Sequence, residues 1–188
     1  MRFTLAPLAA LLAGWSFLAS AQDWQPVERL IVPIPDNWAP VGTEELPSGP
    51  LTVYRSALEP GSDQIGVQRF VGIVDQAPED IASRMLDGLP DTCVQQDAEL
   101  STPTARNQRP LAIVSVICAP QGQDGSTAPD IIEVSRALVL AGNEDLHMVT
   151  RVWRGELGAA DDPIVGGDAG SAWSRFFDSI DYCPATGC

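Results

Sequence analysis

Lysine is absent from this sequence, and its 188 residues include a single histidine. The eleven basic residues are therefore all arginines, and they stand against 25 acidic residues, which gives a formal net charge of −14. Nucleic acids and anionic membranes bind proteins through a basic face that releases counterions. The composition argues against both, and it predicts instead a protein partner that presents a basic face to an acidic surface.

Groups that activate nucleophiles are also scarce. A Ser-His-Asp triad would have to use His147, and the sequence has no G-x-S-x-G elbow to present a serine. We therefore expect no catalytic residue, and we keep a hydrolase that uses His147 as the alternative from a different functional class. The glycines before the last predicted helix, at 166–170, have neither a P-loop lysine nor a dinucleotide fingerprint, so no cofactor is expected.

Metal-binding spacings are missing as well. The cysteines contain no C-x-x-C pair, which argues against zinc. Three aspartates in a glycine-rich loop, Asp161, Asp162 and Asp168, offer oxygen ligands for Ca²⁺, but their spacing differs from that of an EF-hand loop. Whether they bind calcium stays open, and we expect Asp168 to be the N-cap of the following helix.

An export signal is predicted at the start of the chain. Arg2 precedes an almost wholly apolar run, Phe3 to Ala19, and Ala19-Ser20-Ala21 has the small-residue pattern of a cleavage site. No second apolar run of spanning length follows. We therefore expect residues 1–21 to be a cleavable signal peptide and residues 22–188 to form one exported domain, in a bacterial periplasm or secreted beyond it.

Four cysteines lie in the predicted mature chain, namely Cys93, Cys118, Cys183 and Cys188. In an oxidising compartment an even number predicts two disulfides, for which three pairings exist. The strand pattern favours Cys93–Cys118, which leaves Cys183–Cys188 to close a short C-terminal loop. The rival pairing joins Cys93 or Cys118 to Cys183.

Hydrophobic periodicity predicts an α+β fold, a seven-stranded, mainly antiparallel sheet covered by two helices. We expect strands at 30–34, 51–54, 65–73, 94–100, 111–118, 131–140 and 145–154, with a loop over 35–50. The turn 141–144 predicts a hairpin. Helices are expected from Pro78 to Leu89, and around Trp173, Phe176, Phe177 and Ile180.

This order of elements, over Arg29 to Tyr182, resembles the Mog1/PsbP-like group of α/β/α sandwiches. The stretch Leu146 to Glu156, with Trp173 to Cys183, is also similar to the end of a secreted bacterial family of unknown role. The resemblance carries no functional residue with it. It implies a non-catalytic accessory or binding protein.

Tryptophan and arginine, which often anchor protein interfaces, cluster in the last predicted strand. Arg151 and Trp153 share one of its faces, and Arg154 follows. Trp38 lies in a predicted loop, where binding residues are common. We expect these four residues as candidates for binding a partner, with burial of Trp153 in the core as the alternative.

The sequence thus predicts an exported, soluble, non-catalytic periplasmic accessory or protein-binding module that acts through its acidic surface on another envelope protein. An immunity or inhibitor protein of a secreted toxin or enzyme is the second binding hypothesis. The pattern of residues does not identify the partner, a ligand or the oligomeric state.

Overall fold

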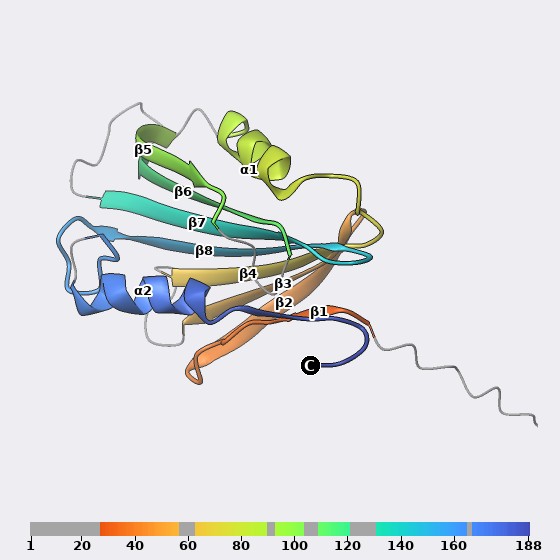
Figure 1. Ribbon diagram of the computed structural model, residues 1–188. Helices are drawn as coiled ribbons and strands as arrows, with labels where there is room; N and C mark the ends of the chain where they lie inside the picture. Colours follow the sequence, from red (N-terminus) through yellow and green to blue (C-terminus); the bar gives the residue numbers. More distant parts are fainter. Residues whose placement is uncertain (1–26, 57–62, 90–92, 104–108, 121–130, 165–166) are drawn as a thin grey trace, which may run out of the picture.

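The computed structural model describes residues 27–56, 63–89, 93–103, 109–120, 131–164 and 167–188 (Figure 1). The predicted signal peptide, 1–21, lies outside them. None of the helices in these ranges has the length and apolar character needed to cross a bilayer. The elements are β1 (Arg29–Ile31), β2 (Trp38–Leu46), β3 (Gly49–Ser56), β4 (Asp63–Phe70), α1 (Pro78–Asp87), β5 (Cys93–Ser101), β6 (Leu111–Pro120), β7 (Ile131–Ala141), β8 (Leu146–Glu156), α2 (Asp168–Asp178) and β9 (Asp181–Cys183).

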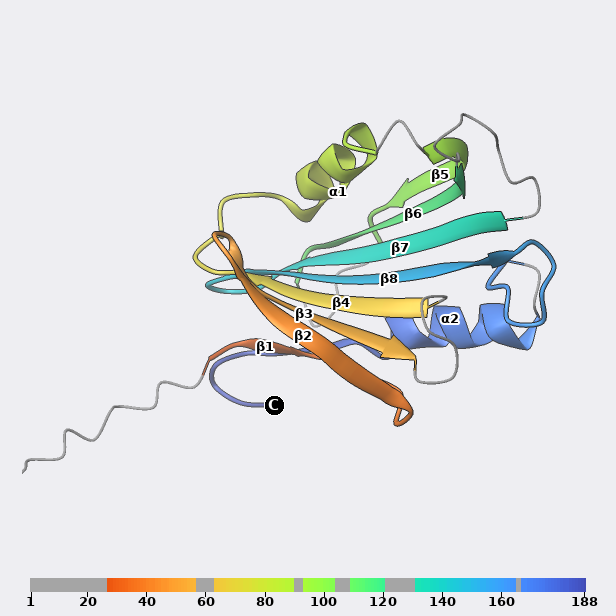
Figure 2. The same cartoon turned by 180° about the vertical axis from the view of Figure 1, so that it is seen from behind.

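Seven strands of the described chain form one antiparallel sheet in the order β2-β3-β4-β8-β7-β6-β5. The two remaining strands, β1 and β9, pair antiparallel in a small separate sheet that joins the two ends of the described chain. Figures 1 and 2 show α1 over the β5–β6 end of the large sheet and α2 under its opposite face.

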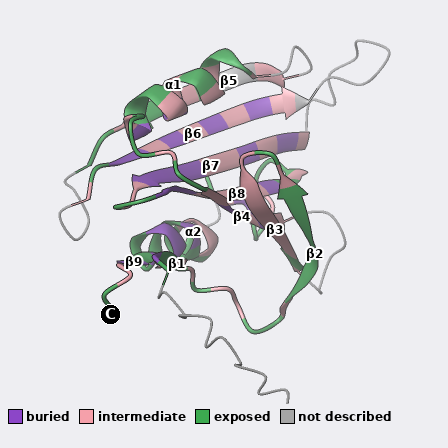
Figure 3. Ribbon diagram, turned by 90° about the vertical axis from the view of Figure 1, so that its right-hand side faces the viewer, coloured by how far each residue is buried: buried purple, intermediate pink, exposed green. Residues whose placement is uncertain are grey.

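The central strands have buried side chains on both faces, and Figure 3 shows buried residues along the length of β6 and β7. One apolar cluster lies between the sheet and α2, around Leu138, Val149 and Phe177. The other lies under α1, around Ala82 and Val114. Since successive side chains of a strand point to opposite faces, β6 contributes to both clusters, as its unbroken apolar run predicts.

The predicted α/β/α sandwich, a seven-stranded sheet covered by two helices, is wrong. The described residues are mostly antiparallel β-structure, and the helices have only ten and eleven residues, so each covers part of one face. The small β1–β9 sheet, which no pattern indicated, adds a further β-layer beside α2. The molecule is therefore mainly β, with two short helices packed on it.

The large sheet has seven strands, as predicted, but they are not the seven predicted strands. Residues 38–46, which we expected to be loop, form the edge strand β2, whereas the strand predicted over 30–34 shrinks to β1 and leaves the large sheet. The β2 pairing is interrupted by an irregularity between Pro40 and Gly42, and its side chains are largely exposed. An edge strand tolerates Pro, Gly and acids that would disrupt a central strand, so its sequence resembles that of a loop.

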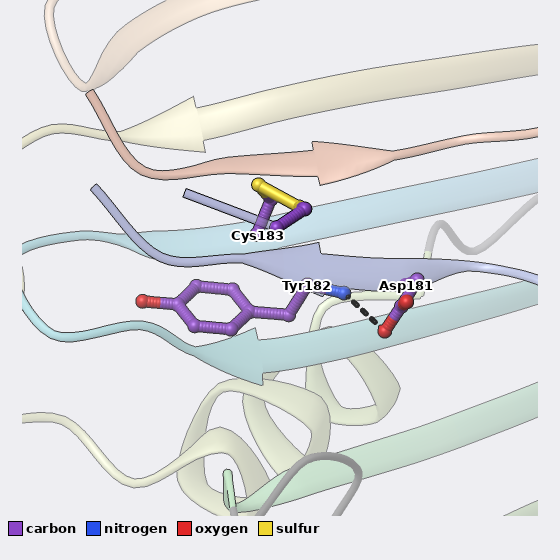
Figure 4. Close-up of a disulfide and its surroundings, with 4 residues drawn as sticks. Asp181, Tyr182 and Cys183 are labelled. Carbon is purple, nitrogen blue, oxygen red and sulfur yellow. Dashed lines mark hydrogen bonds between the residues drawn. A yellow bond between two sulfur atoms is a disulfide. The ribbon is translucent and has the colours of Figure 1, made fainter. Parts of the chain in front are cut away.

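Other local predictions are confirmed. Ala141 pairs with Leu146 across the predicted β7–β8 turn, and α1 begins at Pro78 and ends before Gly88. The cysteines form the favoured disulfides, Cys93–Cys118 between β5 and β6, and Cys183–Cys188 beside Tyr182 at the C-terminus (Figure 4).

Candidate functional site

Strand β8 carries the polar residues of interest along one face. His147, Arg151 and Trp153 alternate in phase with buried Val149, on the side covered by α2. A run of eleven residues spans about 35 Å, so the two ends of β8 form separate environments. The Trp153 end opens into a cavity, and the His147 end is closed by residues from the N- and C-terminal strands.

We call the cavity at the Trp153 end the tryptophan pocket. It has a volume of about 500 Å³, in the range of small-molecule and side-chain sites. Its wall is aromatic or small and apolar, except for two carboxylates, one guanidinium and one hydroxyl. The lining residues are Trp38, Ser56, Asp63, Arg151, Trp153, Ala160, Asp161, Pro163, Ala169, Ala172 and Trp173.

Trp153 forms the inner wall of the pocket. Its side chain is 2% exposed and belongs to the apolar cluster under α2, so the alternative of a core tryptophan holds as well. Its indole Nε1 donates a hydrogen bond of 3.2 Å to Asp161. Gly155 makes room for the ring, because a Cβ there would approach Trp153 Cζ2 to 2.4 Å.

Arg151 forms the floor of the pocket. Its guanidinium donates two hydrogen bonds to the carboxylate of Asp63, at 3.2 and 2.6 Å. Its Cζ lies 4.6 Å from the ring centre of Trp173 and 5.5 Å from that of Trp38. Two indole rings therefore lie within cation–π distance of this guanidinium, which is a favourable arrangement for its charge.

The Asp63 carboxylate is partly desolvated by this packing. Burial raises its pKa, the hydrogen bond and charge of Arg151 lower it, and the nearby charge of Asp161 raises it again, with a net upward direction. Two acids thus share a site that contains one arginine. With both acids ionised, the side chains that line the pocket carry a net charge of −1, from two carboxylates and one guanidinium.

Of the four predicted partner-binding residues, the structure brings three together. Trp38, Arg151 and Trp153 line the pocket, although β2 and β8 are separated by two strands. Arg154 points away, because its place in β8 alternates with that of Trp153, and its side chain is exposed on the other face of the sheet. Sequence reasoning missed Asp63 and Trp173 as partners of Arg151.

The three aspartates considered as calcium ligands, Asp161, Asp162 and Asp168, have different structural roles. The buried Asp162 carboxylate accepts the backbone N–H groups of Gly158 and Ile164, which fixes the loop after β8. Asp161 faces Trp153. Asp168 is the first residue of α2 and not its N-cap, because Gly167 takes that place at a φ of 50°. Among the described residues, these three carboxylates are not in the group whose ligand atoms lie close enough to share a metal ion.

Glu28 organises the closed end of β8. Its carboxylate is 1% exposed and accepts the backbone N–H groups of Asn143, Glu144 and Asp145 as well as the hydroxyl of Tyr182. The approach requires Gly142, because a Cβ there would lie 2.2 Å from Glu28 Oε1. Burial raises the Glu28 pKa, but the four hydrogen bonds outweigh burial and lower it.

His147 lies against this carboxylate without completing a hydrogen bond. Its Nε2 is 3.6 Å from Glu28 Oε1 and, among the described residues, is a buried polar atom without a hydrogen-bond partner. Burial lowers the His147 pKa, and the charges of Glu28 and Asp145 only partly compensate. Asp145 is paired with Arg69 and accepts the Gly72 N–H. Arg69, a charged residue within β4, therefore has an ionic partner.

Glu28, Asp145 and His147 could in principle hold a metal ion, since their ligand atoms lie within 4.8 Å of one another. The donor set fits poorly. Both Glu28 oxygens already accept two hydrogen bonds, and Asp145 is neutralised by Arg69. A cation would have to displace these contacts, so we assign the cluster a structural role.

The same geometry gives no support to a hydrolase that uses His147. The ring is 3% exposed, and within the described ranges no hydroxyl is bonded to its Nε2. A general base needs a substrate or nucleophile proton within hydrogen-bond reach. His147 instead faces the carboxylate that fastens the β7–β8 turn.

No protein-family model matches this chain, and no curated protein is similar to it. The functional argument therefore depends on the site itself.

Proposed function

We propose that this chain is an exported, non-catalytic binding protein that recognises another envelope protein through the face that carries the tryptophan pocket. The observation that carries the proposal is the convergence of Trp38, Trp153 and Trp173 around an open cavity on a strongly acidic protein. Desolvated pockets lined by tryptophan and arginine dominate the binding energy of protein interfaces.

The charge balance supports a partner with a basic face. The net charge of −14 creates a long-range negative potential, which accelerates encounter with a basic surface and weakens as salt rises. The two disulfides support a location outside the cytoplasm, and together with the signal pattern they favour the periplasm or secretion.

The test is capture from an envelope extract with the immobilised chain and two variants. Ala172 is exposed on α2 and lines the pocket, so Ala172→Gln fills the cavity without changing the core. Ser174→Gln is the matched control, because Ser174 is exposed on the same helix and is not among the pocket residues. We expect one protein to be retained at low salt by the wild type and by the control.

The same protein should be lost with Ala172→Gln and should be released by high salt. Equal retention by both variants, or no retention at low salt, would contradict the proposal. If the captured protein is a toxin or enzyme that binding inactivates, the immunity or inhibitor role replaces the accessory role.

A further inference from the structure

The tryptophan pocket contains an unbalanced charge at its mouth. Arg151 donates two hydrogen bonds to Asp63, and Asp161 is the second acid of the pocket. Asp161 is exposed, and among the described side chains only the Trp153 indole bonds to it, through one of its oxygens. The other oxygen is positioned to accept a further donor.

Apart from its charged residues and Ser56, the pocket is lined by apolar and aromatic side chains, which suit a long aliphatic chain. Small residues of the loop after β8 and of α2, Ala160, Ala169 and Ala172, line the same cavity as the indoles of Trp38 and Trp153. Arginine and lysine bury their methylene stems against such apolar surface while keeping the charged end at a polar rim. Indole rings also attract a cation that lies over their faces, as Arg151 already demonstrates here.

We propose that the tryptophan pocket receives an arginine or lysine side chain presented by the partner protein, with Asp161 binding its cationic end. This inference rests on the proposed function and adds the chemical class of the group that is bound. An anionic group is disfavoured, because Arg151 is already neutralised by Asp63 and the pocket keeps a negative excess. A neutral group would gain the aromatic contact but not the ionic one.

The experiment uses short glycine peptides that carry one central arginine, one lysine, or one citrulline, which has nearly the shape of arginine without its charge. Binding is followed by the NMR shift of the Trp153 indole N–H, which suits weak affinities. We expect the arginine or lysine peptide to bind about tenfold more tightly than the citrulline peptide, the usual effect of one charge-assisted hydrogen bond.

The variant Asp161→Asn tests the assigned residue. An asparagine Oδ1 can still accept the Trp153 hydrogen bond, so the loop keeps its shape while the charge is removed. The preference for the charged peptides should disappear in this variant. It should persist in Asp178→Asn, which removes the same charge from an exposed α2 position outside the pocket.

Two outcomes overturn the inference. If the citrulline peptide binds as tightly as the arginine and lysine peptides, or if Asp161→Asn and Asp178→Asn behave alike, the pocket does not recognise a cation. The proposed function is tested by a different result: it fails if Ala172→Gln leaves partner capture unchanged. A partner captured through the pocket with no charge preference would keep the function and remove this inference.

Discussion

Glu28 Oε1 lies 3.6 Å from His147 Nε2, and both side chains are almost completely buried. The carboxylate is needed in its charged form, because it accepts the three N–H groups of the β7–β8 turn. Burial lowers the pKa of His147, so this histidine is still neutral at a pH where an exposed histidine begins to protonate. This pair couples the stability of the fold to pH.

The first prediction concerns stability in mild acid. Because the His147 pKa is lower in the folded chain than its ordinary value of 6.5, the unfolded chain binds a proton first as pH falls. The free energy of unfolding should therefore decrease below about pH 6.5, by no more than about 1.4 kcal/mol per pH unit for one proton. Urea unfolding at several pH values measures this slope.

The control for this prediction is His147→Gln, which should flatten the slope above about pH 5. A second loss should remain in the variant as pH falls through the range below 4.5, since the lowered Glu28 pKa contributes stability that is lost on its protonation. An unchanged slope in His147→Gln would show that other groups control the acid response.

The second prediction concerns the turn that Glu28 fastens. Glu28→Ala leaves the backbone N–H groups of Asn143, Glu144 and Asp145 without their acceptor, the last of them buried, and should lower the free energy of unfolding by about 3 kcal/mol. Gly142→Ala should also destabilise, because its Cβ would collide with the Glu28 carboxylate. Chemical denaturation measures both, with exposed Glu44→Ala as the control, for which we expect a change within about 0.5 kcal/mol.

The third prediction concerns the ion pair at the pocket floor. Arg151→Met leaves the Asp63 carboxylate partly buried without its partner, which should cost about 3 kcal/mol. The double variant Arg151→Met with Asp63→Asn should recover part of that loss, because no uncompensated charge remains. A double-mutant cycle in urea gives the coupling; additive effects of the two substitutions would show that the pair contributes no coupling.

The fourth prediction ranks the disulfides. Cys93–Cys118 joins residues 25 positions apart, whereas Cys183–Cys188 spans five. Loop entropy predicts a loss of about 3.5 kcal/mol when the first pair is replaced by serines, and about 2 kcal/mol for the second. Thermal unfolding of the two double serine variants checks the order. The reverse order would mean that native contacts of the C-terminal loop outweigh chain entropy.

The strands with strong apolar alternation could be predicted from sequence, and those without it could not. The β7–β8 hairpin and the central β6 contain enough β-branched and apolar residues to be recognised as strands from the sequence. By contrast β2 contains Pro40, Gly42 and paired acids, which an exposed edge allows. The alternation at 30–34 did predict a strand that overlaps β1, but the three-residue β9 is too short for any periodicity, and the pairing of the two strands is a tertiary contact.

The tryptophan pocket and the contacts of Glu28 differ in how well the sequence predicted them. Trp38, Arg151 and Trp153 were each recognisable by residue type, although only the fold shows that β2 and β8 bring them to one cavity. The sequence did not indicate a role for Glu28, because its hydrogen-bond partners lie in a turn far along the chain. The nearest sign was Gly142, a turn glycine whose missing side chain makes room for that carboxylate.

The pairing of β1 with β9 has a practical consequence for how the molecule is held. Arg29 is registered with Cys183, so both ends of the described chain leave from one small sheet (Figures 1 and 4). Glu28 fastens that sheet beside Leu146, whereas the pocket lies at the far end of the β4–β8 ladder, where Asp63 pairs with Trp153. A tether attached at the C-terminus is therefore joined to the small sheet, away from the Trp153 end of β8 where the cavity lies.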